Sequence, residues 1–166
     1  PASAKAGTAL LFLLFAFAFG IRILYLFDLR SYPYFDYIVP AFDHINFDVA
    51  ATNFAKGDLL AHATNNKYAP LYKYFLGVIY WLCGRNFYVV YSIQFAMGAL
   101  ASVLVYLIAR DVFGTRAAIF AFLGFALHST EIIYEGIILR EAFVTFWGIA
   151  SLFLLSRLQT AWSTGK

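Results

Sequence analysis

Apolar residues dominate four long stretches of this chain, and polar residues are concentrated between the first two. The apolar stretches cover residues 8–27, 87–109, 117–134 and 137–155. A helix needs about 20 mostly apolar residues to cross the core of a bilayer. A soluble domain of 166 residues has no core large enough to bury four such stretches. The pattern therefore predicts an all-α, polytopic transmembrane protein, with residues 1–166 forming one domain and the four stretches as its spans.

The segment between the first two spans, residues 28–86, is rich in Asp, Tyr, Asn and Pro and is predicted to be a long loop outside the membrane. Within this loop, residues 45–56 are predicted to form an amphipathic helix that ends at Gly57. Residues 69–83 form a second apolar helix, too short to span and therefore expected at the membrane interface. Aromatic residues are expected to anchor this second helix at the headgroups: Tyr68, which lies outside the residues described below, and Tyr72, Tyr74, Tyr80 and Trp81.

The composition agrees with a membrane protein. Hydrophobic residues make up 63% of the chain and charged residues 13%, which is far from the composition of soluble domains. The net charge of +3 is scattered and forms no basic stripe, so no nucleic-acid partner is expected. The single cysteine, Cys83, cannot form an internal disulfide, and we expect it to be buried and inert.

The positive charges predict the orientation of the spans. Lys5 precedes the first span, two arginines lie in the tight loop 110–116, and Arg157 and Lys166 follow the last span. Positively charged loops tend to remain in the cytoplasm. We therefore expect a multi-pass protein of the plasma (inner) membrane, with the loop 28–86 on the non-cytoplasmic side.

Under this topology, acidic residues from distant parts of the sequence gather on one membrane face. They are Asp48 in the long loop, and Glu131, Glu135 and Glu141 at the turn between the third and fourth spans. A charge beside the hydrocarbon is costly unless it is paired, hydrated or functional. Two structural alternatives stay open: Asp48 could cap or solvate its helix, and Glu141 could pair with Arg140 or Arg22.

Short motifs follow one another along nearly the whole chain. They are Phe47-Asp48; Ala51, Ala55, Gly57 and Asp58; Ala69 to Gly77; Ile79-Tyr80 with Cys83-Gly84; Gln94 and Gly98; Leu107 to Gly114; Tyr134 to Gly136; and Arg140 to Phe143. In their order and spacing these motifs resemble the N-terminal part of the bacterial family 39 glycosyltransferases, which have the GT-C fold. That family includes protein O-mannosyltransferases and the aminoarabinose transferase of lipid A.

The resemblance implies an enzyme that transfers a sugar from a polyprenyl-phosphate donor to an acceptor hydroxyl on the outer face, with inversion. Asp48 matches the acidic residue of the first outer loop, which would act as general base. Glu141 matches the second acidic site, with Glu135 as competitor, and would orient the acceptor or a cation near the phosphate. We therefore predict Asp48 and Glu141 as catalytic residues. The predicted substrate-binding residues are Glu135, Tyr72, Lys73, Arg22 and Arg140.

Several features of the predicted site stay open. Arg22 either contacts a lipid phosphate or snorkels to the outer headgroups. No cofactor is predicted with certainty, a divalent cation is left open, and no protein-bound metal is predicted, because His44 and Asp48 alone do not make a metal site. Members of the family usually have many more spans, so we expect a partial or shortened relative. The alternative hypothesis is a non-catalytic scaffold subunit of a larger membrane complex.

Overall fold

The computed structural model describes residues 2–33, 35, 38, 43–59 and 69–163, except for the side chains of 2–6, 160 and 163. Over these residues it contains seven α-helices and no strand, which confirms the predicted all-α class. The helices are α1 (Ala2–Arg30), α2 (Asp43–Ala55), α3 (Pro70–Cys83), α4 (Phe87–Phe113), α5 (Thr115–Ala126), α6 (Ser129–Glu135) and α7 (Glu141–Ser163).

Three of the described helices are long and apolar enough to cross a membrane, and a bent pair supplies a fourth candidate span. The three are α1 from Gly7 to Arg30, α4, and α7 from Glu141 to Gln159, and the bent pair is α5 with α6. These segments coincide with the four apolar stretches of the sequence. The chain is therefore a polytopic membrane protein.

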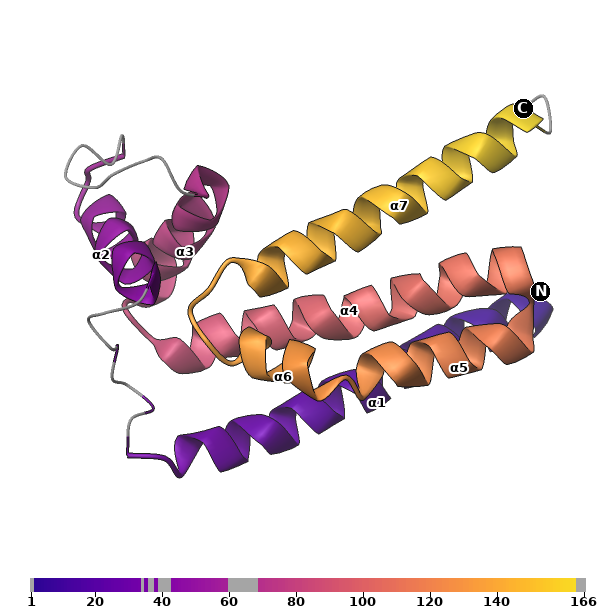
Figure 1. Ribbon diagram of the computed structural model, residues 1–166, viewed down its shortest axis with the longest axis horizontal. Coiled ribbons are helices and arrows are strands. Elements are labelled where there is room, and N and C mark those ends of the chain that lie inside the picture. The colour runs from indigo at the N-terminus through magenta and orange to yellow at the C-terminus, as the bar shows by residue number, and fades with distance from the viewer. Residues whose placement is uncertain (1, 34, 36–37, 39–42, 60–68, 164–166) are drawn as a thin grey trace.

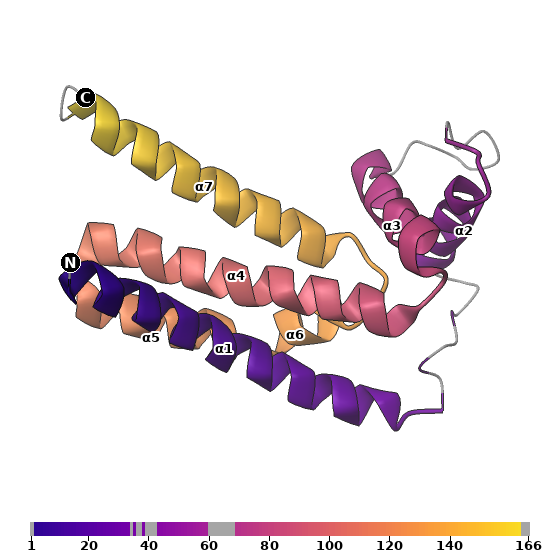
Figure 2. The ribbon, with the colours of Figure 1, turned by 180° about the vertical axis from the view of Figure 1, so that it is seen from behind.

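Helix α4 lies at the centre of a bundle and contacts α1, α5, α6 and α7 (Figures 1 and 2). Small residues line its contacts with α1 and α5, and this core contains Ala18, Ala99, Ala118 and Ala126 around Tyr106 and Phe122. Small side chains allow helix backbones to approach closely, which drives helix association within membranes, where burial from water contributes little.

Helices α2 and α3 pack on each other beyond one end of the bundle, near the starts of α4 and α7 (Figure 1). Helix α2 ends in a Schellman motif, in which Gly57 has a φ of 106° and Asp58 N donates to Asn53 O at 3.0 Å. Helix α3 begins at Pro70, whose fixed φ suits the first turn. The bounds of both helices lie within two residues of the predicted 45–56 and 69–83.

Two of the predicted spans, residues 117–134 and 137–155, have different helix bounds in the structure. Residues 117–134 do not form one straight helix, because α5 ends at Ala126 and α6 starts at Ser129 with a bend of 50°. His128 lies at the break and caps α6, since its Nδ1 accepts from the amide of Glu131 at 3.4 Å. Helix α7 starts at Glu141 rather than at 137, because residues 136–140 form a turn.

Two further predictions about α3 are wrong. Cys83 is exposed rather than buried. Tyr72 and Tyr80 do not lie at the surface as headgroup anchors, because both are buried against α2 and the bundle. Trp81 is exposed, as expected for an interfacial anchor. Helix α3 therefore directs two tyrosines inward and an apolar side outward.

Candidate active site

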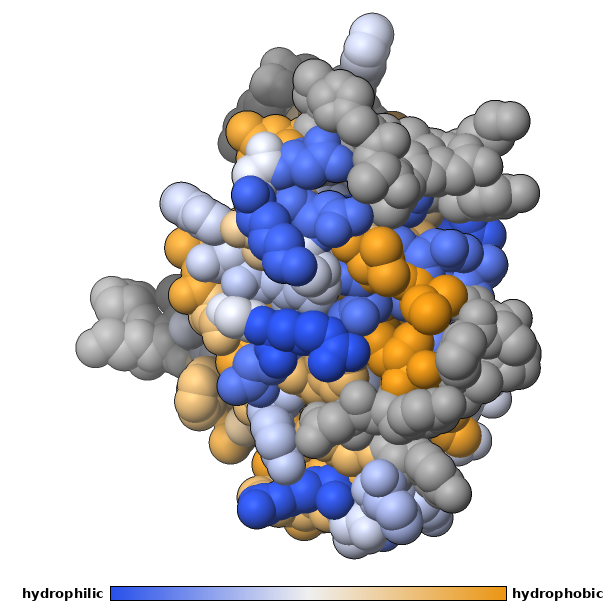
Figure 3. Space-filling view, turned by 90° about the vertical axis from the view of Figure 1, so that its left-hand side faces the viewer, coloured by the Kyte–Doolittle hydropathy of each residue, from blue (hydrophilic) through white to orange (hydrophobic). Residues whose placement is uncertain are grey.

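The end of the bundle that carries α2 and α3 has a partly polar surface. Figure 3 looks onto this end and shows hydrophilic residues gathered across it, with apolar residues beside them. Helix α2 carries Asp48, and α7 starts at this end with Glu141 (Figure 1). The two predicted catalytic carboxylates therefore belong to the same end of the molecule.

Asp48 is held by two donors. Its Oδ1 accepts a hydrogen bond from the Tyr80 hydroxyl at 2.6 Å and another from Arg85 Nε at 2.8 Å. The Asp48 side chain is 12% exposed and the Arg85 side chain is 44% exposed, so the ion pair is open to the surface on the arginine side. Asp43, not Asp48, occupies the first turn of α2, so Asp48 does not cap the helix.

The hydroxyl of Tyr80 stays protonated and therefore remains a donor to this carboxylate. Burial, the hydrogen bond to Asp48 and the charge of Asp48 raise the pKa of Tyr80 well above its ordinary range, although Arg85 lowers it. Tyr80 therefore keeps its proton at any physiological pH. A protonated phenol beside a carboxylate can only donate to it.

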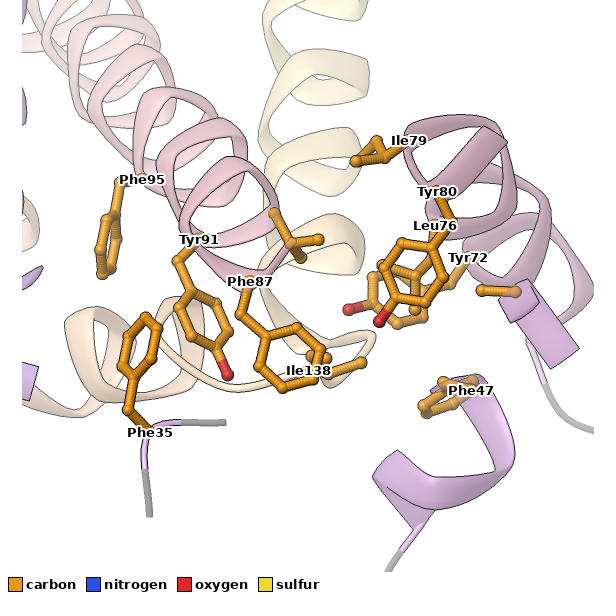
Figure 4. Packing of buried hydrophobic residues seen from close by; sticks show 12 residues of the cluster. Phe35, Phe47, Tyr72, Leu76, Ile79, Tyr80, Phe87, Tyr91, Phe95 and Ile138 are labelled. Atoms are coloured by element: carbon orange, nitrogen blue, oxygen red, sulfur yellow. The ribbon is translucent and has the colours of Figure 1, made fainter. Parts of the chain in front are cut away.

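Tyr72 connects the two halves of the site. Its hydroxyl donates to Gln94 Oε1 at 2.7 Å, and its ring meets that of Phe47 edge to face at 5.0 Å between centroids and that of Phe143 at 6.0 Å. Figure 4 shows Tyr72 and Tyr80 extending from α3 toward the start of α4, with Phe47 of α2 facing them. Phe47 is the neighbour of Asp48, and Phe143 is two residues from Glu141. One tyrosine ring therefore links both carboxylate-bearing helices.

The electrostatic surroundings of Tyr72 agree with this arrangement. Burial is the largest cause that raises the pKa of Tyr72 well above its ordinary value, followed by the nearby Tyr91 and Glu141. Glu141 thus acts on the Tyr72 phenol from α7. Tyr72 is fully buried, so a direct contact between its hydroxyl and a substrate would need a rearrangement of this packing.

Glu141 is the first residue of α7, where the positive end of the helix dipole favours a carboxylate. Arg140 Nε lies 3.9 Å from its Oε1, which is a long ion pair. Its Oε2 is the one buried side-chain polar atom among the described residues that lacks a hydrogen-bond partner. The Glu141 side chain as a whole is 43% exposed, so its carboxylate can be reached from the surface.

A groove of about 410 Å³ lies between the start of α3 and the first turns of α7. It is lined by Ala69, Pro70, Leu71, Tyr72, Arg140, Phe143, Val144, Trp147, Gly148 and Ser151. The groove is apolar apart from a few groups, of which Arg140 carries the charge. This combination suits a molecule with an apolar body and an anionic group.

Arg22 and Glu135 form a buried ion pair. The side chains of Arg22 and Glu135 are 0% and 2% exposed, with Nε to Oε2 at 2.5 Å and Nη2 to Oε1 at 3.0 Å. Arg22 Nη1 also donates to the carbonyls of Ala18 and Ala126. The prediction that Arg22 snorkels to the headgroups is wrong, and neither Arg22 nor Glu135 reaches a surface where a substrate could bind.

The fit of this pair depends on Gly98. A Cβ atom at position 98 would lie 1.9 Å from Glu135 Oε1, so only glycine leaves room for the carboxylate. Gln94, one turn earlier on α4, donates from Nε2 to the carbonyls of Glu135 at 2.6 Å and Ile137 at 2.9 Å. These two bonds hold the segment that follows α6 against α4.

Lys73 is also buried, at 4% exposure, and desolvation lowers the pKa of its ammonium. Of the predicted substrate-binding residues, Arg140 is therefore the exposed one beside the groove. The described residues contain no cluster of three or more His, Cys, Asp or Glu that could hold a metal ion.

Sequence reasoning missed the role of Tyr80 and Arg85 at Asp48, and the role of Gln94 and Gly98 around Glu135. Gln94 and Gly98 stand one turn apart in an apolar stretch, so a polar and a small residue share one face. That spacing was the available signal. No local pattern pairs Asp48 with residues 32 and 37 positions later.

Comparison with known proteins supplies the family. A family model described as dolichyl-phosphate-mannose-protein mannosyltransferase matches residues 67–164, which is more than half of the chain. The matched segment contains α3 to α7 and Glu141, whereas Asp48 and Arg22 precede it. A comparison with curated proteins and one with solved structures each found no match. The chain belongs to the dolichyl-phosphate-mannose-protein mannosyltransferase family, which supports a membrane glycosyltransferase of the GT-C type.

Proposed function

We propose that the protein transfers a sugar from a polyprenyl-phosphate donor to an acceptor hydroxyl at the non-cytoplasmic face of the plasma membrane, as the family 39 glycosyltransferases do. The description of the matched family names a dolichyl-phosphate-linked mannose and a protein. Mannose on a polyprenyl phosphate is therefore the first donor to test, and a serine or threonine hydroxyl of a peptide is the first acceptor.

The proposed reaction is a single displacement with inversion at the anomeric carbon. The acceptor oxygen forms a bond to this carbon as the bond from the carbon to the phosphate oxygen breaks, and polyprenyl phosphate leaves. Asp48 accepts the proton of the acceptor hydroxyl. A carboxylate within hydrogen-bond reach of the attacking group typically contributes about 10² to 10⁴-fold to such a reaction.

The observation that carries the proposal is the environment of Asp48. Its side chain is 12% exposed, is held by Tyr80 and Arg85, and belongs to α2 at the end of the bundle seen in Figure 3. A base for a sugar transfer needs a fixed orientation and an approach for the acceptor. Asp48 meets both requirements, and the other buried carboxylate described, Glu135, is closed off by its pair with Arg22.

Glu141 and Arg140 have a second role in this proposal. Glu141 Oε2 has no hydrogen-bond partner, and the neighbouring residue Arg140 lines the apolar groove. We assign Glu141 to orienting the acceptor, or a cation near the donor phosphate. Arg140 is assigned to the phosphate, because guanidinium binds phosphate with favourable geometry.

The test is a transfer assay on the purified full-length protein with polyprenyl-phospho-mannose and a Ser/Thr-containing peptide. Asp48→Asn removes the base and keeps the size of the side chain, so transfer is expected to fall by about 10² to 10⁴-fold. The matched control is Asp43→Asn, an exposed carboxylate on the same helix. Undiminished transfer by the Asp48 variant would refute the proposed base. A wild-type protein without transfer but with a stoichiometric membrane partner would favour the scaffold hypothesis.

The proposed orientation has its own test, because Cys83 is the single cysteine and is exposed. A membrane-impermeant maleimide is expected to label Cys83 in intact spheroplasts. A Cys83→Ser/Thr115→Cys double variant, with its cysteine at the first residue of α5 beside the turn that follows α4, is expected to react only after the membrane is permeabilised. The opposite pattern would place α2 and α3 on the cytoplasmic side.

A further inference from the structure

We propose that Tyr80 and Arg85 are positioning residues that hold the Asp48 carboxylate in the orientation in which it accepts a proton. This inference rests on the proposed function of Asp48 as the base. Neither residue is assigned to contact the sugar. They act through Asp48.

The geometry of the two hydrogen bonds points to an orienting role. Both donors engage the same oxygen: the Tyr80 hydroxyl lies 2.6 Å and Arg85 Nε lies 2.8 Å from Asp48 Oδ1. Two donors on one oxygen fix the rotation of the carboxylate about its Cβ–Cγ bond. Neither of these bonds uses Oδ2, the oxygen to which we assign the acceptance of the proton.

The two donors are themselves fixed by different parts of the backbone. Tyr80 is buried on α3 in a cluster with Phe47 and Leu76, so its ring has a defined place. Arg85 follows Gly84, whose φ of 71° turns the chain back after α3. Asn86 then caps α4, with its Oδ1 accepting from Tyr88 N at 3.0 Å. The donors are therefore preorganised before a substrate binds.

The Arg85 side chain has a second support. Its guanidinium lies over the ring of Phe87 at 4.5 Å from the centroid, which is a favourable cation–π distance. A lysine would keep the charge but would lose the planar group that stacks on the ring and presents Nε to Asp48. Arg85→Lys and Arg85→Gln therefore separate charge from geometry.

The alternative is a purely structural role, in which these bonds only stabilise the packing of α2 on α3. The two helices already share an apolar interface that includes Phe47, Ala51 and Leu76. Phe54 also packs on α3 where Gly77 leaves space for its ring. This interface does not depend on Asp48. The loss of one polar bond at its edge is therefore not expected to separate the helices.

The chemical consequence of positioning is specific. During transfer the acceptor O–H bond breaks, its proton goes to Asp48 Oδ2, and the polyprenyl phosphate leaves with the electrons of the glycosidic bond. Tyr80 can keep donating to Oδ1 before and after this step, because both the carboxylate and the carboxylic acid accept there. A displacement of the base by about 1 Å would cost on the order of 10²-fold in rate.

The experiment compares Tyr80→Phe, Arg85→Lys and Arg85→Gln in the full-length protein, with polyprenyl-phospho-mannose and a Ser/Thr peptide. Tyr80→Phe and Arg85→Gln are expected to lower kcat by about 10- to 100-fold with KM within about twofold. Arg85→Lys should recover part of the loss.

The matched control is Tyr74→Phe, the same substitution on α3 at a ring that packs on Phe54 instead of Asp48. Thermal unfolding of each variant separates loss of fold from loss of positioning. Kinetics of Tyr80→Phe and Arg85→Gln equal to those of Tyr74→Phe would overturn the inference, and so would a loss confined to KM with kcat unchanged. Full activity of Asp48→Asn, or no transfer by the wild type, would overturn the proposed function and the inference with it.

Discussion

The buried ion pair between Arg22 and Glu135 is predicted to be the most costly polar contact in the bundle to break. Glu135→Gln keeps the shape of the side chain and removes its charge, so the Arg22 guanidinium is left without a counterion between α1, α4 and α6. Because the two side chains are 0% and 2% exposed, water does not replace the lost partner. We expect Glu135→Gln to destabilise the protein strongly.

The magnitude follows from two independent values that agree. Breaking a buried ion pair by removing one partner costs about 3–5 kcal/mol. An unpaired arginine in the middle of a membrane helix costs about 2.5–3.5 kcal/mol on insertion scales. We therefore expect a loss of about 3 kcal/mol for Glu135→Gln. The Arg22→Met/Glu135→Leu double variant should be less destabilised than either single variant, because no charge is left unpaired.

The double variant is not expected to recover fully. Arg22 also donates to the carbonyl of Ala126, the last residue of α5, where the helix breaks. A buried carbonyl that loses its donor costs about 1–3 kcal/mol. The double variant should therefore lie about 1–3 kcal/mol below the wild type. This remainder is the contribution of Arg22 to the bend between α5 and α6.

The assay is reversible unfolding in mixed detergent micelles, followed by circular dichroism. A double-mutant cycle compares the wild type, the Arg22→Met and Glu135→Leu single variants and the double variant. The control is Asp111→Asn, which breaks the partly exposed pair of Asp111 with Arg157 at 2.9 Å. That pair should contribute less than about 1 kcal/mol, as surface ion pairs do. If Glu135→Gln cost no more than Asp111→Asn, or if the double variant were worse than both single variants, the reasoning would be refuted.

Two further predictions concern the glycine beside Glu135 and the buried phenol of Tyr80. Gly98→Ala is expected to destabilise the protein by about 1–3 kcal/mol, because the new Cβ would lie 1.9 Å from Glu135 Oε1. The control Gly124→Ala should be neutral, because nothing lies within 4 Å of its Cβ. Equal thermal unfolding of the two variants would contradict this prediction. Folded Tyr80 keeps its proton where the unfolded chain releases it, so its contribution to the free energy of unfolding is complete below pH 10.0 and declines above it. Lys73, with a lowered pKa, contributes with the opposite sign. Comparing wild type with Tyr80→Phe cancels the Lys73 part, and equal slopes above pH 10 would show that the phenol is not shielded.

The membrane helices could be predicted because their signals are local. Continuous apolar stretches of spanning length predicted α1 and α4, and turn residues predicted the loop helices, with Gly57 ending α2 and Pro70 starting α3. The break between α5 and α6 could not be seen in the same way. The stretch 117–134 is apolar on both sides of it, and the cap by His128 is a single polar contact.

The paired residues of the site could not be predicted because their partners are far apart in the sequence. Arg22 and Glu135 are separated by 113 positions, and nothing local to either residue indicates the other. The sequence showed that an arginine in a span and a glutamate near a boundary needed explanations. It left the choice between substrate, headgroup and ion pair open, since all three satisfy a buried charge.

The buried pair and the candidate site are connected by hydrogen bonds as far as Tyr72 and by ring contacts beyond it. Arg22 fixes the side chain of Glu135, and Gln94 binds the carbonyl of the same residue at 2.6 Å. The other end of the Gln94 amide accepts from Tyr72 at 2.7 Å, and the Tyr72 ring touches the neighbours of both candidate carboxylates. A shift of α6 would therefore move Gln94, then Tyr72, and finally the helices that carry Asp48 and Glu141. A change at the interior ion pair is therefore expected to alter the proposed sugar-transfer site, although neither Arg22 nor Glu135 lines the groove beside α7.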